Sequence, residues 1–90
     1  MANHASALKR ARQARKIRAR KRAQRSAMRT AIKRVRLAVD AGDVERAQQE
    51  LKAAIRVIDS AGRKRLIHPR QASRRVSRLN ASVRKLAVSG

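Results

Sequence analysis

The sequence predicts an all-α protein: an antiparallel three-helix bundle with a long, highly basic N-terminal helix that extends beyond the bundle. Three observations support this fold class. Good helix formers, chiefly Ala, Arg, Lys, Gln and Leu, dominate the 90 residues. Large apolar residues recur at spacings of three and four, which favours helices over strands. The breaks between these runs are short, which favours antiparallel neighbours. We expect a single domain over residues 1–90.

The first helix is expected over about residues 6–41. Its apolar stripe consists of Met28, Ile32, Val35 and Val39. At 100° per residue these side chains fall within about 60° of the helix circumference. Gly42 follows directly and is well placed to stop the helix at its C-terminus.

The second helix is expected over residues 43–59. Asp43 can cap its N-terminus, and Glu45 lies in the first turn, where the helix dipole favours a carboxylate. Its apolar face is formed by Val44, Ala47, Leu51, Ala54, Ile55 and Ile58. The Ser60-Ala61-Gly62 stretch is expected to break the helix.

The third helix is expected over residues 69–87, after a connection at 63–68 whose Leu66 and Ile67 pack against the core. Pro69 suits a first helical turn, where its missing N–H costs nothing. The apolar stripe consists of Ala72, Val76, Leu79, Val83 and Leu86, and Arg70, Arg74, Arg75, Arg78 and Lys85 are expected largely opposite it.

The net charge of +21 is extreme for this length and points to a polyanionic partner. All five acidic residues fall within 40–59, whereas residues 1–39 carry fourteen basic groups and residues 60–90 carry nine. This basic, acidic, basic pattern is not that of a uniformly disordered tail. The acidic second helix is expected to face away from the partner.

The segment 9–25 is the most basic part of the chain, with ten Lys or Arg among seventeen residues and Ile17 as its only large apolar residue. As a helix it carries cations on every side and has no face for a protein neighbour. Like charges at i,i+4 disfavour such a helix when it is free. We expect this segment to fray alone and to become ordered among phosphates.

Catalysis, cofactors and metal binding have little support. His4 and His68 are the only histidines, Cys is absent, and no glycine-rich phosphate loop exists. No apolar run is long enough for a secretory signal or a membrane span, so we expect a cytoplasmic protein with no membrane or small-molecule partner. Two roles stay open for His68: a cap on the third helix or a phosphate contact.

Nucleic acid is therefore the expected partner, and the chemistry favours structured RNA. The planar fork of Arg suits bidentate phosphate contact. A helix charged all round would waste half its cations against one duplex but suits several surrounding RNA backbones. A histone-like DNA-compacting protein remains the alternative. The basic residues expected at the interface are Lys9, Arg10, Arg12, Arg15, Lys16, Arg18, Arg20, Lys21, Arg22, Arg25, Arg29, Lys33, Arg63, Lys64, Arg65, Arg70, Arg74, Arg75 and Arg78.

The chain also resembles a known family over essentially its whole length. The matching features are the opening MANHASALKR, the stretch RSAMRT at 25–30, Ile32-Lys33, the turn at 41–43, Leu66-Ile67-His68, and Ala72, Arg74 and Leu79. In this order and spacing they resemble the bacterial small-subunit ribosomal protein S twenty family. The resemblance implies a three-helix bundle with a long first helix.

The resemblance further implies direct binding to 16S ribosomal RNA, at its 5′ domain and at the long helix near its 3′ end. It implies an early role in subunit assembly, as a monomer beside neighbouring ribosomal proteins. Carried over onto matching positions, it adds uncharged contacts and a histidine to the basic set. The residues it implies are Asn3, Ser6, Lys9, Arg10, Ser26, Arg29, Thr30, Lys33, His68 and Arg74. Pro69 departs from the polar or basic residue expected there.

Overall fold

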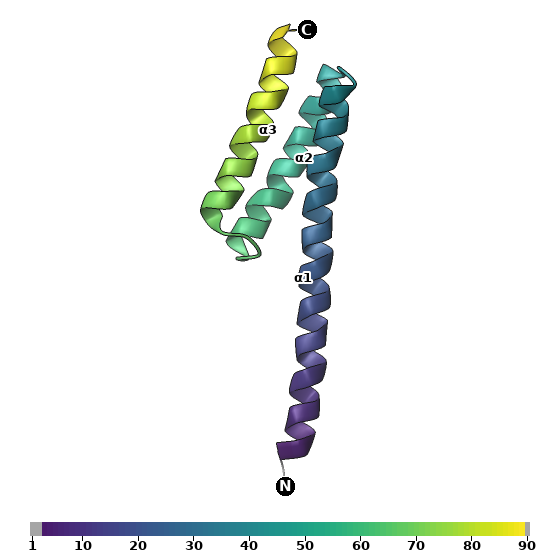
Figure 1. Cartoon of the computed structure of the whole chain (residues 1–90), viewed down its shortest axis with the longest axis vertical. Helices are drawn as coiled ribbons and strands as arrows, with labels where there is room; N and C mark the ends of the chain where they lie inside the picture. The colour runs from purple at the N-terminus through teal and green to yellow at the C-terminus, as the bar shows by residue number, and fades with distance from the viewer. Residues whose placement is uncertain (1–2, 90) are drawn as a thin grey trace.

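The structure is a computed structural model that describes residues 3–89, and over that range three helices are joined by two short turns. Its helices are α1 (Asn3–Asp40), α2 (Val44–Arg63) and α3 (Pro69–Ser89). Figure 1 shows consecutive helices running in opposite directions, with α2 packed against both neighbours. The molecule is long and flat, with extents of 69 × 23 × 14 Å. The all-α, three-helix prediction is confirmed; Met1, Ala2 and Gly90 lie outside the described residues.

The core is small and rich in alanine. Among the described residues, the large side chains that are fully buried are Val35 and Ile58. The buried set is Met28, Ile32, Val35, Ala38, Ala47, Ala54, Ile58, Ala61, Ala72, Leu79 and Val83. Three of its alanines recur every seventh residue along α2, so a methyl group is all that separates the middle helix from its neighbours at these points. The predicted stripes are therefore correct in register, although Val39 is only partly buried and Ala38 is buried beside it.

In the turn between α1 and α2, the residues Gly42 and Asp43 end the first helix, and Asp43 also caps the second. Gly42 has φ +73°, its N–H donates to the Val39 carbonyl at 3.0 Å, and the Asp43 N–H donates to the Ala38 carbonyl at 3.0 Å. These two bonds form the Schellman motif that ends α1. The Asp43 side chain then accepts a hydrogen bond of 3.0 Å from the backbone N–H of Arg46, which caps α2. The predicted stop and cap are both confirmed.

The predicted break at Ser60-Ala61-Gly62 is wrong, because α2 continues to Arg63. A second Schellman motif ends it: the Leu66 N–H donates to the Ala61 carbonyl at 2.9 Å, and the Arg65 N–H donates to the Gly62 carbonyl at 3.2 Å. Arg65 occupies the left-handed position of this motif with φ 62°. The glycine expected to end the helix therefore lies inside it, and an arginine takes the conformation that glycine usually supplies.

Gly62 serves the packing of α2 against α3. It is buried, and a Cβ built on it would lie 2.9 Å from the Ala72 Cβ. Real carbon atoms do not approach so closely, so this crossing needs a residue without a side chain at position 62. Leu66 and Ile67 are partly buried against the core, as predicted.

Helix α1 overshoots the bundle. Its 38 residues span about 57 Å at about 1.5 Å per residue, whereas α2 has only 20 residues. Figure 1 shows the N-terminal half of α1 projecting alone beyond the α2–α3 turn. Met28 is the first buried residue of α1, and Gln24 is half-buried. We call residues 4–23, all of which are exposed, the α1 extension.

Candidate nucleic-acid interface

The α1 extension holds the largest share of the predicted interface. Exposed side chains from the predicted set are Ser6, Lys9, Arg10, Arg12, Arg15, Lys16, Arg18, Arg20, Lys21 and Arg22, with Arg25 just beyond, and Asn3 is the first residue of α1. At 100° per residue, Arg18, Arg15, Arg12 and Lys9 lie at successive 60° steps over one half of the helix circumference, and Arg10 and Lys21 lie on the other half. Cations therefore surround the extension rather than marking one face of it.

Ile17 shows where the protein's own packing ends. It lies on the meridian of the buried stripe of α1, yet its side chain is 50% exposed. The helix pattern continues past the last residue that has a protein neighbour. Any partner that covers the extension must therefore come from outside this chain.

Within the bundle, the predicted residues of α1 remain at the surface. Ser26, Arg29, Thr30 and Lys33 are all exposed. They belong to the side of α1 turned away from its buried stripe, so they continue the cationic surface of the extension up the helix.

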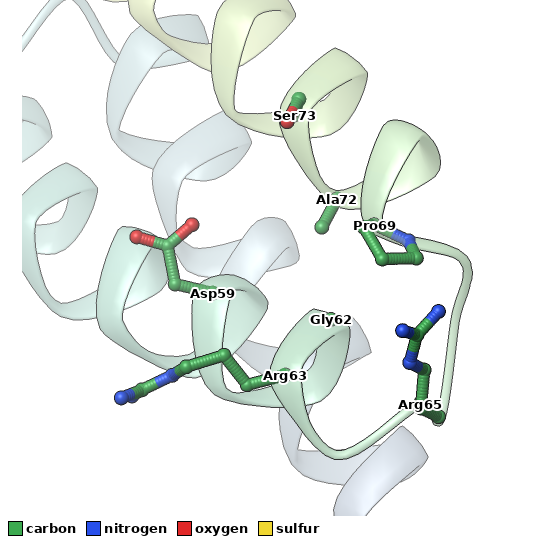
Figure 2. A pocket seen from close by; sticks show the side chains of 7 residues that line it. All are labelled: Asp59, Gly62, Arg63, Arg65, Pro69, Ala72 and Ser73. Carbon is green, nitrogen blue, oxygen red and sulfur yellow. The ribbon is translucent and has the colours of Figure 1, made fainter.

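The turn between α2 and α3 carries a second group of predicted residues, and two of them, Arg63 and Arg65, line a cleft of about 720 Å³ (Figure 2). Arg63, Lys64, Arg65 and His68 are all exposed here. Figure 2 shows the Arg65 side chain beside Pro69, whereas Arg63 points away from it, on the side of Asp59. Because Asp59 also lines the cleft, its charge is mixed.

His68 caps α3. Its Nδ1 accepts a hydrogen bond of 3.1 Å from the backbone N–H of Arg70, and its carbonyl accepts from the Ala72 N–H at 3.0 Å. Of the two roles left open for this residue, the structure shows the cap. Nε2 is the ring nitrogen that this bond leaves for a partner.

A groove of about 210 Å³ lies between the C-terminal part of α1 and the helix α3. Its lining consists of Ile32 and Arg36 from α1 and Gln71, Arg74, Arg75, Arg78, Leu79 and Ser82 from α3. Four of these eight residues are arginines, and none is acidic. Among the described residues, the Nε of Arg75 is a buried side-chain nitrogen with no hydrogen-bond partner.

The groove shows that one predicted interface residue was misplaced on its helix and that one interface residue was missed. Arg75 was expected opposite the apolar stripe of α3, but it is half-buried at the edge of that stripe, beside Leu79. Arg36 was absent from the expected interface, yet it lies across the groove from the arginines of α3. The sequence could have indicated Arg36, because it lies one helical turn after the buried Ile32. A residue in that position borders the helix that packs on the apolar stripe.

The acidic residues lie on other surfaces. Asp43 and Glu50 line a cleft between α1 and α2 together with Arg34 and Arg46, while Asp59 borders α3 with Ser73 and Ser77. The clefts that contain carboxylates thus have both charges in their lining, whereas the charged residues that line the groove between α1 and α3 are all arginines. The negative charge of α2 is kept away from that groove.

Residues 3–89 contain no cluster of metal ligands and no helix suited to span a membrane. In this part of the chain no three His, Cys, Asp or Glu side chains gather as a metal site would require. None of the three described helices combines the length and the apolar content that crossing a membrane demands.

The fold and this charge pattern define a small, helical, polycationic protein. A model of the family described as Ribosomal protein S20 matches residues 2–84. Several small ribosomal subunit proteins named bS20 are similar over nearly the whole chain. That of Magnetococcus marinus is 53% identical, covering 99% of this chain and 97% of its own length. That of Methylococcus capsulatus is 54% identical (98% and 96%), and that of Thioalkalivibrio sulfidiphilus 56% (96% and 100%).

The chain therefore belongs to the ribosomal protein S20 family of the small ribosomal subunit. The family resemblance inferred from the sequence is confirmed. The match begins at residue 2 and includes the whole α1 extension, so this segment is part of the family pattern and not an addition to it.

Proposed function

We propose that this chain is a non-catalytic structural protein that binds 16S ribosomal RNA directly and neutralises phosphates where RNA helices approach one another. Its family places it with proteins of the small ribosomal subunit. The RNA contacts would lie in the 5′ domain and along the long helix near the 3′ end. It would act as a monomer in the cytoplasm, within the ribosome and without a cofactor, beside neighbouring ribosomal proteins.

The α1 extension is the observation that carries this proposal. Twenty consecutive residues form a helix with no buried side chain and with cations at all angles around it. Such a helix gains no stability from tertiary packing and loses some to like-charge repulsion. Phosphate backbones on several sides would supply the missing counter-charge, and the release of their counterions would drive binding.

The test compares binding of the full chain to small-subunit ribosomal RNA and to duplex DNA of equal length across a range of salt concentrations. With on the order of ten phosphate contacts, log K should fall with log salt at a slope of roughly −7 to −9. Affinity for the ribosomal RNA should exceed that for DNA at physiological salt. Equal affinity for the two would contradict the proposal and favour a DNA-compacting protein.

A matched pair of variants locates the interface. The first replaces Arg12, Arg15 and Arg18 of the extension with Gln; the second replaces Arg46, Lys52 and Arg56 of α2 with Gln. All six side chains are exposed, and both variants lose three positive charges. The extension variant should lose much more RNA affinity and reduce the salt slope by about 2–3. Similar losses in both variants would mean that net charge alone drives binding.

A further inference from the structure

The groove between α1 and α3 brings four arginines together, and its lining contains no acidic residue. Ile32 and Leu79, both buried, form its apolar floor. Arg36 on α1 and Arg75 on α3 border it from opposite sides. Cations over an apolar floor interact more strongly with an anion than cations on an open helix do, since less water screens them.

Arg75 carries the second and independent observation. Its Nε is buried and has no hydrogen-bond partner among the residues that the structure describes. A buried donor left unpaired is costly, and the donors of a guanidinium are arranged to meet two oxygens of one anion.

We propose that this groove is a specific site for one phosphate group of the RNA backbone, held by Arg75 with Arg36, Arg74 and Arg78. The proposal rests on the RNA-binding function proposed above and adds a defined site to it. The phosphate meets the guanidinium groups of these arginines and joins α1 to α3, which otherwise contact each other much less than either contacts α2.

The size of the groove favours a phosphate group over a larger ligand. Its volume of about 210 Å³ is below the roughly 300 Å³ at which small-molecule pockets begin. The larger cleft at the α2–α3 turn is less suited to an anion, because Asp59 contributes a carboxylate to its lining (Figure 2).

The sharpest test keeps the charge and removes the fork. Arg75→Lys preserves the net charge but lacks Nε, and Arg84→Lys is its matched control on the other flank of α3, where Arg84 lines the cleft with Asp59. We expect Arg75→Lys to lower affinity for small-subunit ribosomal RNA about tenfold or more, with little change in the salt slope. Arg84→Lys should bind like the parent chain.

A second pair tests the α1 side of the groove. Arg36→Gln removes a groove arginine, whereas Arg34→Gln removes an equal charge two residues away, in the cleft between α1 and α2. Arg36→Gln should cost at least several-fold more affinity than Arg34→Gln. Thermal melts of all four variants in the absence of RNA separate a binding defect from a folding defect.

A direct readout uses inorganic phosphate as the probe. In a ¹⁵N-labelled chain, the Nε–H resonance of Arg75 should shift and saturate as phosphate is added, while that of Arg84 shifts less and without saturation. If the chain binds ribosomal RNA but each groove variant matches its control and the Arg75 resonance does not respond, the groove proposal is overturned and the RNA-binding function stands. If the parent chain does not prefer ribosomal RNA over DNA, the function proposed above fails.

Discussion

Replacing Gly62 with Ala tests the close packing of α2 against α3. In an ordinary helix this change stabilises by up to about 1 kcal/mol, because Ala is the better helix former. Here the new Cβ would lie 2.9 Å from the Ala72 Cβ, and Ala72 cannot move it aside by rotating a side chain. The helices must separate by several tenths of an ångström, and overpacking of this kind costs about 1–3 kcal/mol.

The net expectation is a loss of about 1 kcal/mol in the free energy of unfolding, or about 4–8 °C in the melting temperature of a domain of this size. Circular dichroism at 222 nm during a thermal melt measures it. The companion variant Ala72→Gly removes the opposing methyl group, so the double variant should be more stable than the two single effects predict by about 1 kcal/mol. If Gly62→Ala melts at or above the parent temperature, the close contact does not limit the crossing and the reasoning is wrong.

Three further predictions follow from local geometry. Asp43→Ala should cost about 1 kcal/mol in a thermal melt, because the Arg46 N–H loses its acceptor; Asp43→Asn should retain most of the stability, and equal losses would argue against capping. Arg65→Gly should raise the free energy of unfolding by about 0.5–1 kcal/mol, because it relieves left-handed backbone strain of about 1–2 kcal/mol, which exceeds the entropy that glycine adds to the unfolded chain. The same change should weaken RNA binding. A lower free energy of unfolding would contradict the strain argument. Amide hydrogen exchange in the free chain should be fast over residues 4–23 and slow over 28–38, with the first range slowed by added ribosomal RNA; equal protection in the free chain would show that the extension is stable alone.

The register of each helix could be predicted because it depends on one periodic pattern of apolar residues. Met28, Ile32 and Val35 repeat at intervals of four and three, and all three are buried. The cap at Asp43 and the stop at Gly42 depend on neighbouring residues alone, so the sequence specified them as well. Features whose cause lies within one turn of helix are within reach of sequence reasoning.

The end of α2 could not be predicted from local rules, because its cause is tertiary. A glycine near the end of an apolar run ordinarily signals a stop, and Gly62 carries that signal. Its actual role is set by Ala72, ten residues later, whose Cβ needs the empty space. The stop itself falls on Arg65, where the backbone adopts a conformation that the residue type disfavours.

The groove could not be predicted from the sequence either, but for a different reason. Three helices with given apolar stripes can pack with either hand, and the hand decides whether α3 borders the flank of α1 that carries Arg36 or the flank that carries Arg34. Periodicity within each helix does not distinguish these two arrangements. The list of exposed cations was therefore accessible from the sequence, whereas the pairing of Arg36 with Arg75 across one groove required the structure.

These results separate two kinds of cationic surface in one small chain. The α1 extension has charge at every angle and no floor, so the affinity of each arginine there should depend on salt and on charge, with Lys nearly as good as Arg. The groove has an apolar floor and a buried, unpaired Nε, so its arginines should depend on geometry, with Lys a poor substitute. Replacing Arg15 with Lys should consequently leave RNA affinity nearly unchanged, while the same replacement at Arg75 should not. Equal effects at the two positions would mean that the chain reads phosphates by charge alone, and that its fold serves only to hold that charge in place.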